Sequence, residues 1–330
     1  MTATEGVQVE VVNADAQEFS CDVLVLKYAQ ALHGVDKVVA ERLHQVFTPE
    51  WLPPDGFRII PSADSGLAAR SVLFVGVVPL RDFRYREIRE FVSKAFRSLA
   101  GEVPDAAHVA LTLHGTGYGL DERECFLAEL GGVLDATSSG DVPRDLRTVS
   151  FVEANGGRYN RLRDLVTSVL PEQVLARDPQ PLQQRLAREQ SVLRSVGFDS
   201  SSKPLVFVAM PISPETEDRF HYGIQPPIDS LGCLCERIDK SPGTGDIVER
   251  IRDTISRSVV VVADLTDFNP NVFLEVGYAW GKGIPTVLLI SKEQVGSLPF
   301  DVRTQTCLVY GTIQELEQHL AKSLPPLLGS

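Results

Sequence analysis

The chain has 330 residues, more than one compact domain usually contains, so two domains with separate cores are expected. Hydrophobic residues make up 43% of the chain, which is typical of a folded protein and argues against disorder. The formal net charge of -12 opposes non-specific binding to nucleic acid or anionic lipid, because both need clusters of Lys and Arg. Neither a nucleic acid nor a membrane is therefore expected as a partner.

The five cysteines show no CxxC or His/Cys spacing, and most of them lie in apolar segments. We expect them to be reduced core residues and expect no metal site. The amino terminus has no basic stretch followed by an apolar one, and no apolar run approaches the roughly 20 residues that span a bilayer. These features predict a cytoplasmic protein.

Short β-branched runs alternate with amphipathic stretches in the first half, the pattern of parallel strands covered by helices. Six strands are predicted there, at 7–12, 22–26, 57–60, 71–78, 108–113 and 147–152. Helical spacing of apolar residues predicts four helices, at 36–47, 85–100, 122–136 and 159–170. Together these elements predict a first α/β domain over residues 1–170.

A segment rich in Pro, Gln, Arg and Ser follows, and it predicts a partly helical linker over 171–203, with an exposed helix near 181–195. Residues 204–330 form the second predicted domain. Its five strands are expected at 203–210, 233–238, 259–264, 285–290 and 306–311, with helices between them. Right-handed crossovers would then produce a flavodoxin-like parallel sheet. The predicted fold class is α/β, with two three-layer α/β/α domains.

One carboxylate, Glu275, stands among apolar residues in a helix that Asn269 can cap and Pro270 can begin. Val272 and Val276 share its face, so Glu275 is expected to be partly desolvated at the carboxyl edge of the sheet. A shielded carboxylate is suited to attack a sugar C1′ or to stabilise an oxocarbenium-like centre there. Alternatively, it caps backbone amides or pairs with a distant arginine, such as Arg237 or Arg303.

The stretches "VFVAMPI" and "ADLTDFNPNVFLEVGYA" resemble the nucleoside 2-deoxyribosyltransferase-like family, whose structural relatives include Toll/interleukin-1 receptor (TIR) domains. The resemblance covers about residues 203–323. It implies cleavage of N-glycosidic bonds in nucleosides, nucleotides or NAD, with Glu275 as the catalytic glutamate. It also implies that Asp264, Asn269 and Asn271 hold sugar hydroxyls or position Glu275. Met210, Pro211 and Tyr222 would line the base and sugar pocket. Alternatively, Asn269 is only a cap and Asp264 only forms a turn.

In the first domain, "GTGYG" places Gly115, Gly117 and Gly119 between a predicted strand and a predicted helix. Amides exposed by such a loop suit a diphosphate, although a tight turn with positive φ would also explain the glycines. The stretches "GTGYGLD" and "NADAQEFSCDVLVL" resemble macro domains and the macro-like domain of leucine aminopeptidases. That resemblance implies an ADP-ribose-type ligand held by the Gly115–Gly119 loop, which includes Thr116, with Asp22 near the adenine.

Both resemblances together predict an N-glycosidase acting on NAD or a related nucleotide and switched by a nucleotide-derived ligand of the first domain. No cofactor is expected, because NAD or the nucleotide would be the substrate. Such fusions resemble bacterial anti-phage effectors, and the resemblance implies homo-oligomers. The alternatives are a non-catalytic nucleotide-binding or signalling protein, a nucleoside deoxyribosyltransferase or nucleotide N-hydrolase, and an interaction scaffold.

Overall fold

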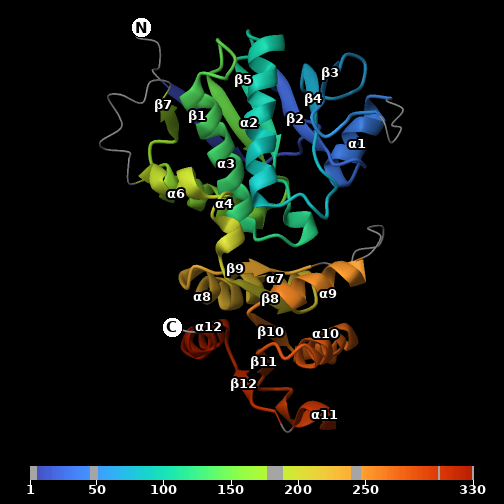
Figure 1. Ribbon diagram of the computed structural model, residues 1–330, viewed down its shortest axis with the longest axis vertical. Coiled ribbons are helices and arrows are strands. Elements are labelled where there is room, and N and C mark those ends of the chain that lie inside the picture. The colour runs from blue at the N-terminus through green and yellow to red at the C-terminus, as the bar shows by residue number, and fades with distance from the viewer. Residues whose placement is uncertain (1–5, 45–50, 177–188, 239–246, 304, 329–330) are drawn as a thin grey trace. The chain divides into compact units, whose positions relative to one another are not determined.

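The computed structural model describes residues 6–44, 51–176, 189–238, 247–303 and 305–328. The chain divides into two compact units (Figure 1). The first contains Met1–Thr116 and Glu122–Ser201, and the second contains Gly117–Asp121 and Ser202–Ser330. Both units are built from sheets and helices, so the predicted α/β class is confirmed.

The first unit contains a seven-stranded mixed sheet with the order β3-β4-β2-β5-β6-β1-β7. The edge strands β3 and β7 are antiparallel to their neighbours, and the other pairs are parallel. The strands are β1 Gly6–Val12, β2 Val23–Tyr28, β3 Phe57–Pro61, β4 Ser71–Gly76, β5 His108–Thr112, β6 Thr148–Val152 and β7 Val174–Ala176. The helices are α1 Gly34–Arg42, α2 Tyr85–Glu102, α3 Glu122–Ser139, α4 Gly156–Val169 and α6 Glu189–Ser195.

The strand β7 and the helix α6 both lie in the segment that was predicted to be a linker. Residues 177–188 of that segment lie outside the described part of the chain. The strand β7 was not predicted, because a strand of three residues is too short to show alternation.

Helices cover both faces of this sheet, as two adjacent residues of β6 show. Phe151 packs edge to face on Phe126 of α3, with 4.9 Å between the ring centroids. Val152 belongs instead to a buried cluster that includes Val39 and Ala40 of α1. Because adjacent residues of a strand point to opposite faces, α1 and α3 lie on opposite sides of the sheet. The helix α2 packs beside α3, so this unit has the three layers that were predicted.

The second unit contains a five-stranded parallel sheet with the order β9-β8-β10-β11-β12. Counted from β8, this is the order 2-1-3-4-5 of flavodoxin-like folds, as predicted. The strands are β8 Leu205–Ala209, β9 Leu234–Glu236, β10 Val260–Asp264, β11 Thr286–Ser291 and β12 Cys307–Tyr310. The helices are α7 Pro214–Asp218, the π-helical η3 Arg219–Ile224, α8 Gln225–Ser230, α9 Ile247–Arg257, α10 Pro270–Gly281, α11 Phe300–Arg303 and α12 Ile313–Ser323.

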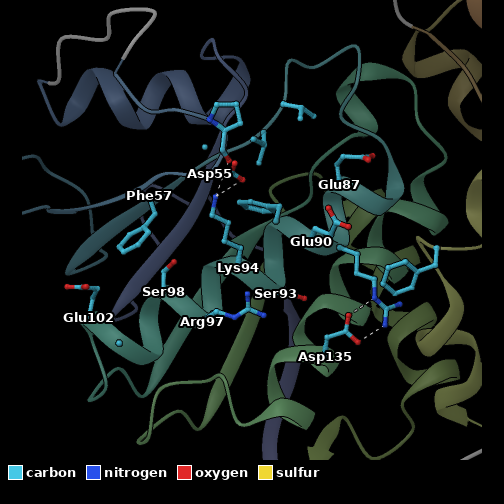
Figure 2. Close-up of a pocket in the computed structure, with 18 residues that line it drawn as sticks. Asp55, Phe57, Glu87, Glu90, Ser93, Lys94, Arg97, Ser98, Glu102 and Asp135 are labelled. Atoms are coloured by element: carbon cyan, nitrogen blue, oxygen red, sulfur yellow. Dashed lines mark hydrogen bonds and ion pairs between the residues drawn. The ribbon is translucent and has the colours of Figure 1, made fainter.

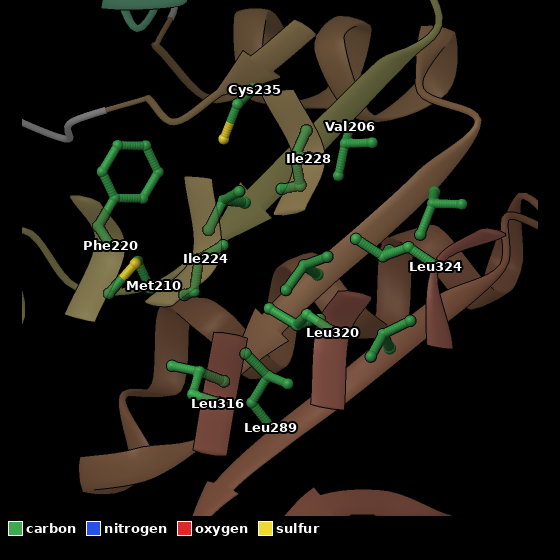
Figure 3. Close-up of a cluster of buried hydrophobic side chains, with 14 of the residues drawn as sticks. Val206, Met210, Phe220, Ile224, Ile228, Cys235, Leu289, Leu316, Leu320 and Leu324 are labelled. Atoms are coloured by element: carbon green, nitrogen blue, oxygen red, sulfur yellow. The ribbon is translucent and has the colours of Figure 1, made fainter. Parts of the chain in front are cut away.

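Two buried clusters lie on the two faces of this second sheet. Val206 of β8 belongs to a cluster with Ile228 of α8 and with Leu316 and Leu320 of α12 (Figure 3). The next residue along β8, Phe207, belongs to a cluster filled by apolar side chains of α9 and α10. The alternation again places helices on both faces, so the second unit also has three layers.

Candidate functional site

The strand order of the second sheet reverses between β8 and β10, and ligands of open parallel sheets bind outside the carboxyl ends of the strands at such a point. Met210 and Pro211 directly follow β8, and Asp264 is the last residue of β10. The helix α10 begins six residues after Asp264. These loops are therefore positioned to border one site.

The beginning of α10 has the local structure that the sequence predicts. Asn269 has an extended backbone, and its side-chain Oδ1 accepts a hydrogen bond of 2.9 Å from the backbone N–H of Asn271. Pro270 is the first helical residue, where its missing N–H costs no helical hydrogen bond. Glu275 consequently lies in the second turn of α10, and its residue is only 8% exposed.

A pocket of about 150 Å3 lies at this edge of the sheet. Five of the seven residues that were predicted for the second domain line it together: Met210, Pro211, Asn269, Asn271 and Glu275. Three apolar residues that were not predicted complete the described lining: Ile212, Ile238 and Val272. Their only signal in the sequence was their position at the ends of predicted strands or beside Glu275.

The composition of this pocket determines what it can bind. Its volume is below the roughly 300–1,000 Å3 of sites that enclose a whole drug-sized ligand, so it fits one ring of a larger molecule. Five of the eight described lining residues are apolar, and two amide side chains and one carboxylate provide the polar side-chain atoms. Amide and carboxylate groups are suited to bind hydroxyl groups, and an adjacent carboxylate can act at an anomeric carbon.

Asp264 lies outside the described lining of this pocket and has no exposed surface. Arg219 Nη1 donates to its Oδ2 at 2.6 Å, and the backbone N–H of Thr266 donates to its Oδ1 at 3.0 Å. The hydroxyl of Tyr310 lies 3.3 Å from Oδ2 and 2.9 Å from the Thr266 hydroxyl. Burial, followed by the charge of Asp264, raises the pKa of Tyr310 to about 12, so this hydroxyl stays protonated. These contacts make Asp264 an anchor of the loop before α10.

Tyr222 also lies outside the described lining. It belongs to the π-helical turn η3, and 55% of its surface is exposed. The neighbouring His221 is buried, with its Nδ1 3.0 Å from Gln225 Oε1 and its Nε2 3.1 Å from Glu217 Oε2. The π-helical turn therefore directs His221, and not Tyr222, towards the interior.

The three glycines of the predicted glycine loop differ in backbone conformation and belong to different units. Gly115 and Gly119 both have positive φ, the conformation of the tight-turn alternative, whereas Gly117 does not. A Cβ at Gly119 would lie 2.5 Å from the carbonyl oxygen of Arg237. The backbone N–H of Arg237 donates to the Gly119 carbonyl at 3.2 Å. Gly119 is therefore explained by backbone conformation and close packing within the second unit.

Asp22 lies just before β2 and near His108, the first residue of the parallel neighbour β5. Its Oδ2 accepts hydrogen bonds of 2.9 Å from the backbone N–H groups of Ala107 and His108. The glycine loop follows the opposite, carboxyl end of β5. The structure therefore places Asp22, predicted near the adenine, and the glycine loop, predicted at the diphosphate, at opposite edges of the sheet, because parallel strands have their amino and carboxyl ends there.

Four buried ionisable residues lie at the carboxyl edge of β2 and β5. They were not among the site residues predicted from the sequence. Lys27 Nζ lies 2.5 Å from Asp36 Oδ2, and His114 Nδ1 lies 2.9 Å from Glu129 Oε1. His114 Nε2 lies 3.8 Å from Asp36 Oδ1 and connects the two pairs. The signals available in the sequence were a lysine inside the apolar run "VLVLKY" and a histidine directly before the glycine loop.

A separate cavity of about 720 Å3 lies along α2 in the first unit (Figure 2). Its wall includes Phe57 of β3, the side chains of Lys94 and Arg97, and the paired side chains of Arg89 and Asp135. None of the site residues predicted from the sequence is among its described lining residues.

Neither a protein-family model nor a curated protein matches this sequence. Solved structures that resemble the chain include a CMP N-glycosidase of Clostridium botulinum, with a TM-score of 0.30, 19% identity and coverage of 35% of this chain and 96% of that chain. They also include an Oceanobacillus iheyensis macrodomain with ADP, with a TM-score of 0.38, 16% identity and coverage of 49% and 91%. A Trypanosoma brucei macrodomain in complex with ADP has a TM-score of 0.35, 16% identity and coverage of 49% and 69%. Similarities at this level do not assign the chain to a family.

Among the described residues, no group of three or more His, Cys, Asp or Glu side chains is arranged to hold a metal ion. In the same part of the chain, no helix has both the length and the apolar character needed to cross a membrane.

Proposed function

We propose that the second unit hydrolyses the N-glycosidic bond of NAD or a related nucleotide. The observation that supports this proposal is the pocket at the carboxyl edge of the sheet, where Glu275 lies beside Asn269 and Asn271. The pocket fits a ribose ring, the two amides are suited to its hydroxyl groups, and the carboxylate is suited to the anomeric carbon.

In the proposed reaction, the bond between C1′ and the base nitrogen breaks, and its electron pair leaves with the base. The Glu275 carboxylate stabilises the positive charge that develops at C1′ or bonds to that carbon. Water then supplies the oxygen that replaces the base, and one of its protons is released. Glu275 is only 8% exposed, and this burial strengthens the electrostatic effect of the carboxylate.

We further propose that an ADP-ribose-type ligand binds at Gly115 and Thr116, in the part of the loop after β5 that belongs to the first unit, and switches the activity on. This loop follows a central parallel strand at its carboxyl end, where amides of α/β sheets commonly meet anions. Formation of homo-oligomers and a role in anti-phage defence belong to the same proposal.

Base release from NAD and from deoxynucleotides, with and without ADP-ribose, tests the activity on the full-length protein. Wild type should release free base, and Glu275→Gln should lower the rate by at least about a hundredfold, as removal of a group that stabilises transition-state charge does. The matched control is Glu249→Gln, an exposed glutamate of α9, which should retain full activity. Equal rates for wild type and Glu275→Gln would refute the role of Glu275, and no base release under any condition would refute the activity.

A further inference from the structure

The charges around the pocket indicate which part of a nucleotide it recognises. Among the described lining residues there is no Lys or Arg, so none of them offers a cation to a phosphate. Phosphate groups are usually bound by charge-assisted hydrogen bonds from guanidinium or ammonium groups. Among the described residues, guanidinium groups next to this lining are therefore suited to meet a 5′-phosphate.

Arg237 is one such group. Its Nη1 lies 3.9 Å from the sulfur of Met210, which lines the pocket, and the next residue along the chain, Ile238, lines it as well. The Arg237 side chain is only 10% exposed, and its guanidinium stacks on the ring of Phe220 at 3.9 Å from the centroid. The position of Arg237 beside the lining suits it to reach a phosphate attached to a sugar in the pocket.

The guanidinium of Arg237 forms an ion pair with Glu217. Glu217 Oε1 accepts a hydrogen bond of 2.6 Å from Arg237 Nη2, and Glu217 Oε2 lies 3.1 Å from Nε2 of His221. A second guanidinium at this edge of the sheet, that of Arg219, donates to the carboxylate of Asp264. Each of these two positive charges is thus neutralised by a carboxylate of the same unit.

Resting on the proposed N-glycosidase function, we infer that Glu217 is a specificity-determining residue. It masks Arg237, so that the site selects the nucleoside end of its substrate and gains no affinity from a 5′-phosphate. A phosphate that approaches Arg237 must compete with a carboxylate already held by a short charge-assisted bond, and it is repelled by the charge of that carboxylate. A 5′-phosphate or 5′-diphosphate then adds no affinity over a 5′-hydroxyl.

Binding of nicotinamide riboside and of its 5′-monophosphate, which differ only in the phosphate, tests this inference by calorimetry. The full-length protein carries Glu275→Gln so that the ligands are not consumed. The two dissociation constants should agree within about threefold, since Arg237 and Arg219, the two guanidinium groups described above, are already paired with carboxylates. Adding Glu217→Gln should lower the dissociation constant of the monophosphate by about tenfold, the effect of one charge-assisted hydrogen bond. The dissociation constant of the riboside should stay unchanged.

Two further variants serve as controls. Glu215→Gln removes an exposed carboxylate from the same helix, α7, and should leave the ratio of the two dissociation constants unchanged. Adding Arg237→Gln to Glu217→Gln should abolish the gain for the monophosphate, because the unmasked guanidinium is then absent.

Three results would overturn the inference: tenfold tighter binding of the monophosphate before Glu217 is changed, an unaltered ratio after it is changed, or no binding of either ligand. Base release by the wild type is measured separately. If the binding results are as expected but no base is ever released, the proposed function fails while the masking of Arg237 stands.

Discussion

Arg219 and Asp264, which are 45 residues apart in the sequence, form a hydrogen-bonded ion pair at the end of β10, with 2.6 Å between Arg219 Nη1 and Asp264 Oδ2. Asp264 is completely buried, and the Arg219 side chain is 15% exposed. The pair connects the π-helical turn η3 to the end of β10. Its integrity therefore affects both the stability of the second unit and the position of Glu275.

Replacing Asp264 by Asn should lower the free energy of unfolding of the second unit by roughly 3 kcal/mol, because the buried charge of Arg219 loses its partner. Base release should fall as well, since the loop before α10 loses its anchor. Urea denaturation and the base-release assay measure the two effects. Asp267→Asn, at a nearby side chain that is 55% exposed, should cost less than about 1 kcal/mol. Equal losses for the two variants would contradict the anchoring role of Asp264.

Asn269 combines a helix cap with a place in the pocket lining, and two substitutions separate these roles. Asn269→Asp keeps an oxygen that caps the helix, so stability should be retained while the amide donor in the pocket is lost. Its base-release rate should therefore drop. Asn269→Ala should additionally lower the free energy of unfolding by about 1 kcal/mol, the usual effect of losing a cap. Thermal unfolding and base release distinguish the variants, and full activity of Asn269→Asp would leave Asn269 with a capping role alone.

The hydrogen bond from His221, followed by the charge of Arg237, lowers the pKa of Glu217 from 4.5 to about 2, against an opposing effect of burial. Because the folded-state pKa is the lower one, the stabilisation is complete above pH 4.5 and is lost as the pH falls from 4.5 towards 2. Glu217→Gln should therefore flatten the decline of the urea midpoint over this range. A decline as steep as that of the wild type would show that the Glu217 contacts do not stabilise the fold.

Burial lowers the pKa of His114, but the carboxylates of Asp36, 3.8 Å away, and Glu129, within hydrogen-bond distance, outweigh burial, and the net shift is upward from 6.5. A raised histidine pKa contributes stability that is complete below pH 6.5 and is lost as the pH rises through the folded-state value. His114→Gln should remove this alkaline decline in the free energy of unfolding of the first unit. His44→Gln, at an exposed histidine, should preserve it. Denaturant titrations between pH 6 and 9 provide the comparison.

All five cysteines are free, and four of them are buried. Burial raises the pKa of Cys235 well above 9 and that of Cys21 to about 12, so both thiols are largely protonated and unreactive at neutral pH. In a native protein treated with a thiol reagent, Cys307, which is partly exposed, should react first. Mass spectrometry of the labelled peptides identifies the site. Rapid labelling of Cys235 under native conditions would be inconsistent with its buried position.

Much of the fold could be predicted from residues close together in the chain. The β-branched runs mark the strands, and Asn269 followed by Pro270 marks the beginning of α10. Because the distance from that helix start to Glu275 is fixed by the helical repeat, the position of Glu275 in the second turn could also be predicted. These features depend on backbone geometry and local hydrogen bonds, which neighbouring residues largely specify.

Contacts between distant segments could not be predicted in this way. The partner of Asp264, the location of Asp22 away from the glycine loop, and the cluster that joins Lys27 to His114 all depend on the order and direction of the strands. The grouping of Gly117–Asp121 with the second unit is of the same kind. A single sequence records the periodicity of each strand but not its neighbour, so pairing, burial and charge compensation emerge only when the segments pack together.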